Sequence, residues 1–193
     1  MADNIHPIHD RTVQRSERED RNGHPGGVYW LTGLSGSGKS TIATAVERQL
    51  FEAGQFVVLL DGDNVRTGLC GDLGFSLEDR RENIRRIAEA AKLFVATGAR
   101  VLCSFVSPTR EIRAMARDII GSEDFHEVFV NTPLEICESR DVKGLYAKAR
   151  AGQIKNFTGI DSPYEAPTHP FLDLKTADLT VAQAASKLIE AMG

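Results

Sequence analysis

The chain has 193 residues, of which 41% are apolar and 26% are charged. These are ordinary values for one globular domain with a sizeable buried core. The formal net charge of −4 argues against general nucleic-acid binding. No apolar stretch is long enough to span a membrane, and the N-terminus lacks the apolar middle of a signal peptide, so we expect a cytoplasmic protein. The three cysteines show no C-x-x-C spacing, which argues against a disulfide framework or a zinc site.

Residues 1–26 are polar, and we interpret them as an N-terminal extension with a short helix near 12–20. From 27 to 193, apolar runs alternate with amphipathic helical segments. Strands are predicted over 28–31, 55–60, 100–105, 125–130 and 171–174. Helices are predicted to begin near residues 41, 77, 108, 133, 145 and 180, with Pro108 in a first helical turn. The alternation predicts an α/β fold, a five-stranded parallel sheet with helices on both faces. The aliphatic run 55–60 is expected to be buried on both faces.

A glycine-rich segment follows the first predicted strand and precedes a helix. Residues 33–40 match the G-x-x-x-x-G-K-[ST] phosphate-binding loop, or P-loop. Glycines let backbone N–H groups approach phosphate oxygens, and the helix adds the positive end of its dipole. Lys39 is expected to reach the β- and γ-phosphates of ATP, and the Ser40 hydroxyl to bind Mg²⁺. The expected ATP contacts are Gly33, Leu34, Ser35, Gly36, Ser37, Gly38, Lys39, Ser40 and Thr41.

Three further turns should lie beside the P-loop. In parallel sheets covered by helices on both faces, ligands bind outside the carboxyl ends of the strands. The turns that follow the other predicted strands are 61–64, 104–107 and 132–133. We therefore expect all of these segments to open onto one site.

Two carboxylates follow the second predicted strand. Phosphoryl transfer needs Mg²⁺ near the β- and γ-phosphates and a group that accepts or orients the attacking hydroxyl. Asp63 is our candidate for the substrate hydroxyl, and Asp61 for support of the metal. The alternative for both is an Asp-Gly turn with a helix-capping aspartate.

Basic and aromatic residues after this turn suggest a second substrate that carries phosphate or sulfate. The candidates are Arg66, Phe75, Arg80 and Asn83. Arg80 and Asn83 lie three or four residues from apolar positions of the same helix, so they border its buried stripe. A guanidinium there can bind an anionic group through paired hydrogen bonds. A solvated helix face is the better interpretation for Arg81, Arg85 and Arg86.

Six blocks of sequence resemble the adenylylsulfate kinase (APS kinase) family of P-loop kinases. The blocks are residues 33–41, 61–69, 75–86, 105–108, 127–150 and 157–167. The P-loop block is generic, whereas the last two blocks are specific to this family. The resemblance implies that MgATP phosphorylates the 3′-hydroxyl of adenosine 5′-phosphosulfate (APS), giving ADP and 3′-phosphoadenylylsulfate in sulfate assimilation. It also suggests a homodimer.

The resemblance implies roles for single residues. Phe75 and Phe157 should stack on the adenine of the sulfated nucleotide. Its phosphosulfate and ribose should contact Arg66, Arg80 and Asn83. Further expected substrate contacts are Val106, Ser107 and Lys143, and Arg140 is an expected ATP contact. Ser107 matches the family's phosphoserine position, and we count it with Lys39 and Asp63 as a catalytic candidate. The alternative for Ser107 is a helix cap.

Residues 138–160 are expected to form a mobile lid over both nucleotides. This segment carries five cations and three glycines, which suits closure over phosphates and exclusion of water. The alternative is a basic, solvated helix and loop.

The chain departs from the family pattern at three places. Thr67 stands where histidine is expected, Thr109 stands where an aromatic residue is usual, and residues 168–179 match loosely. Another small-molecule P-loop kinase, of the sugar-acid or shikimate type, is the main alternative, and it would give Phe75 and Phe157 no role. A GTP-binding switch is disfavoured because the sequence has no N-K-x-D guanine motif.

Overall fold

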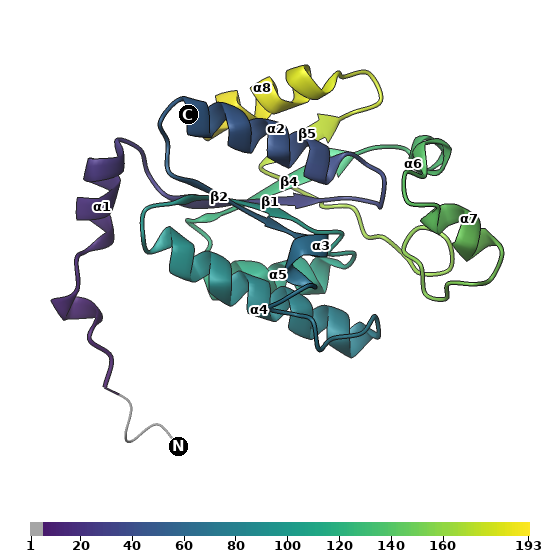
Figure 1. Ribbon diagram of the computed structural model, residues 1–193, viewed down its shortest axis with the longest axis horizontal. Coiled ribbons are helices and arrows are strands. Elements are labelled where there is room, and N and C mark those ends of the chain that lie inside the picture. Colours follow the sequence, from purple (N-terminus) through teal and green to yellow (C-terminus); the bar gives the residue numbers. More distant parts are fainter. Residues whose placement is uncertain (1–5) are drawn as a thin grey trace.

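The computed structural model describes residues 6–193 and contains a five-stranded parallel sheet (Figure 1). The strands are β1 (Gly27–Thr32), β2 (Val57–Asp61), β3 (Arg100–Ser104), β4 (Phe125–Asn131) and β5 (Leu172–Lys175). Their order is β2-β3-β1-β4-β5, and each neighbouring pair is parallel. The predicted parallel sheet is therefore confirmed, with β1 at its centre.

Helices cover both faces of this sheet and also lie beyond its two ends (Figure 1). They are η1 (His9–Arg11), α1 (Arg15–Asn22), α2 (Lys39–Glu52), α3 (Gly62–Val65), α4 (Leu77–Val95), α5 (Arg110–Ile120), α6 (Leu134–Arg140), α7 (Leu145–Arg150) and α8 (Val181–Met192). Helices α2 and α8 lie on one face, and α4 and α5 on the other (Figure 1). Helices α6 and α7 lie beyond the carboxyl end of the sheet, where the predicted site should open.

Alternate residues of β1 face the two apolar cores. Val28 and Trp30 belong to the core under α4 and α5, whereas Tyr29 and Leu31 belong to the core under α2 and α8. All six residues of the strand are buried. A period of two is expected of a strand covered on both faces. The P-loop therefore starts from a strand that is buried along its whole length.

One local prediction is confirmed only in part, and another is wrong. Strand β2 packs against both apolar cores, with Val58 and Leu60 on one face and Val57 and Leu59 on the other. Its residues are only half-buried, because the strand lies at the edge of the sheet. An aliphatic run predicts a strand but carries no information on its position in the sheet. Pro108 is not in a helical turn, because α5 begins at Arg110 and the Thr109 hydroxyl accepts the N–H of Ile112 at 3.3 Å.

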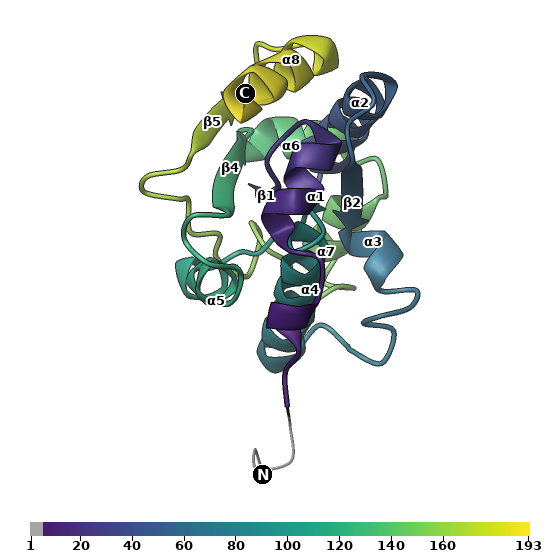
Figure 2. The ribbon, with the colours of Figure 1, turned by 90° about the vertical axis from the view of Figure 1, so that its left-hand side faces the viewer.

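Helix α1 of the N-terminal extension packs on the amino end of the sheet, in front of it in Figure 2. Arg15 donates two hydrogen bonds of 2.7 Å to Asp124, and the Asn22 amide donates to the Gly98 carbonyl at 3.1 Å. The short helix predicted near 12–20 exists, shifted to 15–22. The boundary at residue 26 stays a prediction. Within residues 6–193, no helix combines the length and apolarity needed to cross a membrane.

Candidate active site

The P-loop connects β1 to α2 at the carboxyl edge of the sheet. Gly33 has a φ of 153°, and a Cβ there would lie 2.6 Å from the Val130 carbonyl oxygen. Gly36 has a φ of 73°, and a Cβ there would meet the Cys137 carbonyl oxygen at 3.0 Å. Both positions therefore require glycine. Because α2 begins at Lys39, its unpaired N-terminal N–H groups adjoin this loop, as anion binding requires.

The side chain of Lys39 is buried inside the P-loop. Its Nζ donates to the carbonyl oxygens of Gly33 at 3.0 Å and Leu34 at 2.7 Å. Burial lowers the pKa of Lys39 to about 8. An ammonium fixed there can stabilise negative charge on a phosphate held by the loop.

Ser40 on α2 and Asp61 at the end of β2 form a hydrogen bond at the carboxyl edge of the sheet. The Ser40 hydroxyl donates to Asp61 Oδ2 at 2.6 Å, and it lies 3.2 Å from the Ser104 hydroxyl. The other carboxylate oxygen accepts the N–H of Asp63 at 3.0 Å, so Asp61 also caps α3. The helix-capping alternative for Asp61 is therefore correct, and it coexists with the contact to Ser40.

The donors around Ser40 suit a magnesium ion. They are all oxygens, which hard cations prefer. Within residues 6–193, no group of three or more His, Cys, Asp or Glu side chains could hold a metal. Mg²⁺ usually binds through one or two carboxylates and completes its shell with phosphates and water. Ser40 and Asp61 therefore fit a metal that arrives with a nucleotide.

The segment predicted as a lid contacts both the P-loop and Asp63. The Lys143 ammonium pairs with the Asp63 carboxylate, and both side chains are more than half exposed. Arg140 Nη1 donates to the carbonyl oxygens of Gly36 and Ser37, each at 3.3 Å. One lid cation, Arg140, thus lies beside the phosphate-binding loop, and a second, Lys143, lies beside Asp63. The mobility of the lid stays a prediction.

Arg80 joins the two segments that carry the candidate stacking residues. Its Nε donates to the carbonyl oxygen of Phe75 at 3.0 Å. Its terminal nitrogens donate to the Asn156 carbonyl at 2.7 Å and the Thr158 hydroxyl at 3.1 Å. These two partners flank Phe157. One half-buried guanidinium therefore connects the Phe75 and Phe157 segments, which are distant in the sequence.

Other predicted substrate residues adjoin this arrangement. The Arg66 guanidinium lies 4.3 Å from the ring centre of Phe75, whose side chain is 68% exposed. Phe157 packs edge-on against Tyr146, with ring centres 5.0 Å apart. The buried Oδ1 of Asn83 has no hydrogen-bond partner in the described part of the chain. Because an unsatisfied buried polar atom costs about 1–3 kcal/mol, this oxygen suits a donor from a ligand.

Ser107 is buried in an uncommon backbone conformation. Its φ is +37°, in the region that non-glycine residues rarely adopt. Its hydroxyl accepts a hydrogen bond from Trp30 Nε1 at 3.0 Å. The Val106 carbonyl oxygen accepts from the Thr32 hydroxyl at 2.8 Å. The helix-cap alternative for Ser107 is wrong because Thr109 caps α5. The substrate and phosphoserine roles stay predictions.

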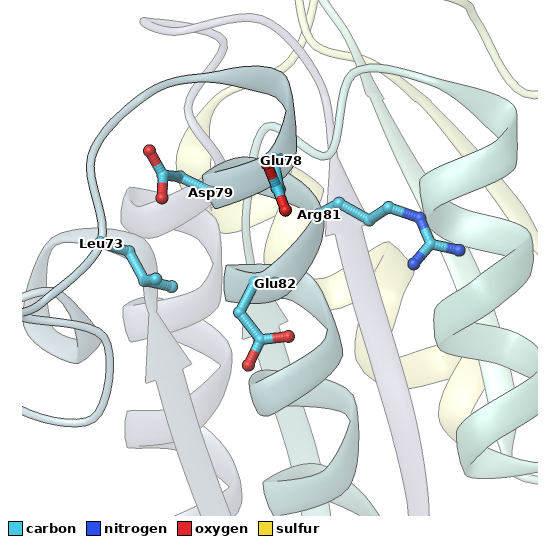
Figure 3. A pocket seen from close by; sticks show the side chains of 5 residues that line it. All are labelled: Leu73, Glu78, Asp79, Arg81 and Glu82. Carbon is cyan, nitrogen blue, oxygen red and sulfur yellow. The ribbon is translucent and has the colours of Figure 1, made fainter.

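The remaining arginines of α4 form ion pairs with nearby carboxylates. The pairs are Arg81–Glu111 (3.7 Å), Arg85–Glu82 (2.7 Å) and Arg86–Asp72 (2.6 Å). The solvated-face interpretation is therefore confirmed for Arg81 and Arg85. Arg86 is only 26% exposed and also donates to the Leu69 carbonyl oxygen at 3.0 Å, so for it the interpretation is wrong. A cavity of about 390 Å³ opens beside these arginines, lined by Leu73, Glu78, Asp79, Arg81 and Glu82 (Figure 3). Three carboxylates against one guanidinium disfavour an anionic ligand, so we do not place a nucleotide there.

Several supporting residues were not predicted from the sequence. The Tyr146 hydroxyl donates to the Ser35 carbonyl oxygen at 2.9 Å, and the Tyr164 hydroxyl lies 3.0 Å from the Thr32 hydroxyl. Both tyrosines fall in blocks of family resemblance, which is the only signal that could have found them. Arg113, which contacts the Ser107 carbonyl, has no such signal.

A sequence profile described as adenylylsulphate kinase matches residues 25–175. The chain belongs to the adenylylsulfate kinase family. An adenylyl-sulfate kinase of Phocaeicola vulgatus is 57% identical over 188 residues, which cover 97% of this chain and 92% of that relative. One of Yersinia pestis is 59% identical over 171 residues, covering 89% and 80% respectively.

Solved structures agree with this membership of the adenylylsulfate kinase family. The Mycobacterium tuberculosis APS kinase in complex with AMPPNP and APS is 51% identical, with a TM-score of 0.84 over 87% of this chain and 98% of that chain. A sugar kinase from Janibacter is only 20% identical with a TM-score of 0.57 and shares the fold alone. The chain is therefore an ATP-dependent P-loop kinase, and the sugar-acid or shikimate alternative is set aside.

Proposed function

We propose that the protein transfers the γ-phosphoryl group of ATP to the 3′-hydroxyl of APS, giving ADP and 3′-phosphoadenylylsulfate. One observation carries this proposal. In a chain of the adenylylsulfate kinase family, the P-loop follows β1 and Asp63 follows β2 at the same edge of the sheet, where Ser40 contacts Asp61. At this edge Arg80 also joins the Phe75 and Phe157 segments.

The ATP side of the site rests on the P-loop. Residues 33–41 supply backbone N–H groups and the N-terminus of α2, which favour phosphate oxygens. Lys39 and Arg140 add positive charge from inside the loop and from the lid. Ser40 and Asp61 would hold Mg²⁺, which supplies positive charge at the β- and γ-phosphates when it is bound.

Asp63 is proposed to act on the attacking hydroxyl. As the 3′-oxygen forms its bond to the γ-phosphorus, the bond from that phosphorus to the β–γ bridging oxygen breaks, and Asp63 takes the hydroxyl proton. A positioned general base typically contributes about 10²–10⁴-fold to the rate. Lys143 pairs with this carboxylate, so we infer that it orients Asp63 and then helps to bind the substrate.

The sulfated nucleotide is proposed to lie between the Phe75 and Phe157 segments. Stacking on two aromatic rings suits a purine, and guanidinium groups suit its phosphosulfate. The unpartnered Asn83 oxygen and the Arg66 and Arg80 guanidiniums support a polar ligand beside the rings. Further proposed contacts are Val106, Ser107 and Lys143.

We extend the proposal to assembly and location. We propose a homodimer in the cytoplasm, with residues 27–193 as the kinase domain and residues 138–160 as a mobile lid. The dimer and the lid rest on the family resemblance of the sequence, whereas the location and the domain boundary rest on its composition. Light scattering on the purified chain would measure its mass, and a monomeric mass would contradict the dimer.

The first experiment is a coupled assay of ADP release. The protein is given MgATP with APS, AMP, shikimate or gluconate in separate reactions. Turnover with APS and none with the other acceptors is the expected result. Turnover with a sugar acid in place of APS would retain the P-loop chemistry and overturn the proposed substrate.

A further inference from the structure

Arg113 is a buried guanidinium on α5, outside the P-loop. Its side chain is only 3% exposed. Its Nε donates to Glu127 of β4 at 2.5 Å, and its two terminal nitrogens donate to the carbonyl oxygens of Ser107 at 2.8 Å and Glu165 at 2.6 Å. Every nitrogen of this guanidinium therefore binds a different segment of the chain.

These contacts call for a guanidinium rather than for an apolar side chain. If the side chain only filled space, an apolar residue of similar volume would stabilise the fold at least as well, because removing an ion pair from water is costly. A planar guanidinium instead fixes several acceptors in set directions. Glu127 balances the charge of Arg113, which leaves the two terminal nitrogens to hold two backbone carbonyls.

The first of these carbonyls belongs to the strained Ser107. A non-glycine residue with a φ of +37° persists only where its surroundings hold it there. Arg113 donates to the Ser107 carbonyl oxygen, and Trp30 donates to the Ser107 hydroxyl. The proposed function places the Ser107 backbone against the substrate, and these two hydrogen bonds from the protein interior fix its position.

The second carbonyl belongs to the segment 164–166, which follows the loop that carries Phe157. This segment is attached to the start of α5. The Glu165 N–H donates to the Pro108 carbonyl at 2.8 Å, and the Glu165 carboxylate accepts the N–H of Arg110 at 2.8 Å. Arg113 therefore lies where the Ser107 backbone and the end of the Phe157 loop meet.

We propose that Arg113 is a positioning residue for the sulfated-nucleotide side of the site. It holds the Ser107 backbone and the Phe157 loop in a fixed relation to each other, whereas the ATP side is built separately on the P-loop. This inference rests on the proposed function and adds a residue to it. Loss of Arg113 should therefore weaken APS binding selectively.

The test compares Arg113→Met, Arg113→Lys and the double variant Arg113→Met/Glu127→Met with Arg117→Met. The double variant removes the carboxylate that Arg113→Met would leave buried without a partner, so it keeps the test valid if the single variant fails to fold. Arg117 is the matched control, because it lies one turn further along α5 and is exposed. The KM values for APS and ATP, kcat and thermal unfolding are measured for each variant.

We expect the KM for APS to rise about 10- to 100-fold in Arg113→Met and in the double variant, with the KM for ATP within about twofold. Arg113→Lys should recover part of the loss, because an ammonium can still reach some of the three acceptors. Arg117→Met should match the wild type. The single tryptophan, Trp30, donates to Ser107, so its emission should change in Arg113→Met and not in Arg117→Met.

Two different failures can be told apart. If the wild type turns over APS but the KM for APS in the folded Arg113 variants stays within about twofold of the wild-type value, or rises no more than the KM for ATP, Arg113 does not position the APS side and the inference is wrong. If the wild type does not turn over APS at all, the proposed function itself is wrong.

Discussion

The Lys143 ammonium pairs with the Asp63 carboxylate and so connects the segment 138–160 to the end of β2. This contact lies next to the bond between Ser40 and Asp61, because Asp61 also accepts the N–H of Asp63. The negative charge of Asp63 therefore has two effects: it attracts Lys143 of the segment 138–160, and it allows Asp63 to accept the proton in the proposed reaction.

Asp63→Asn should lower kcat by about 10²–10⁴-fold, because the amide cannot accept the hydroxyl proton. The KM for ATP should change little, since the P-loop does not depend on this side chain. Asp72→Asn is the matched control, because Asp72 is an exposed carboxylate paired with Arg86 on the outer side of α4. A variant that kept wild-type kcat would remove Asp63 from the mechanism.

Lys39→Ala should lower turnover by about 10²–10³-fold, as expected for a group placed at developing charge. The buried ammonium contacts the P-loop carbonyls of Gly33 and Leu34, so thermal unfolding is measured alongside the rate. Lys92→Ala, on the exposed side of α4, serves as the control. An unchanged rate in a folded Lys39 variant would contradict the P-loop mechanism.

ATP affinity should fall with rising pH above about 8. Burial lowers the pKa of Lys39 to about 8 from its ordinary value of 10.5, and only the protonated form attracts phosphate. Above this pKa, binding must take up a proton, so the apparent Kd should rise toward about tenfold per pH unit. Calorimetry at pH 8.5 (about half a unit above this pKa) in two buffers of different ionisation enthalpy would detect the uptake. Lys39→Met should abolish it, and equal uptake in that variant would assign the proton to another group.

Phe75→Ala should weaken APS binding by about 1–3 kcal/mol through lost stacking on the base. Phe51→Ala is the control, because Phe51 is 65% exposed against 68% for Phe75 and lies at the far end of α2. Equilibrium binding of each nucleotide separates the two pockets. Weakened binding of ATP alone would mean that the pockets have been assigned the wrong way round.

The parts of the site that follow from local patterns could be predicted from the sequence. The P-loop is contiguous, and the contact between Ser40 and Asp61 needs only the rule that carboxyl ends of parallel strands share one edge. Arg113 could not be predicted, because its partners lie 6, 14 and 52 residues away and no periodic pattern links them.

The positive φ of Ser107 could not be predicted from the sequence either. A Ser-Pro pair after a strand favours a helix cap, but the cap is Thr109, and tertiary contacts from Trp30 and Arg113 hold Ser107 at positive φ. The edge position of β2 could not be predicted from the sequence for a related reason. The order of the strands depends on how the helices pack and not on the composition of one strand.

Asp124→Asn should destabilise the protein modestly without affecting catalysis. Arg15 of α1 donates two hydrogen bonds to this carboxylate. Because the Arg15 side chain is 35% exposed, the pair is screened, and its loss should cost about 1 kcal/mol. For a chain of this size that corresponds to a fall in Tm of about 2–4 °C. Asp118→Asn, an exposed carboxylate of α5, is the control. A changed KM for either nucleotide would show that α1 supports the site, and the boundary predicted at residue 26 would then be wrong.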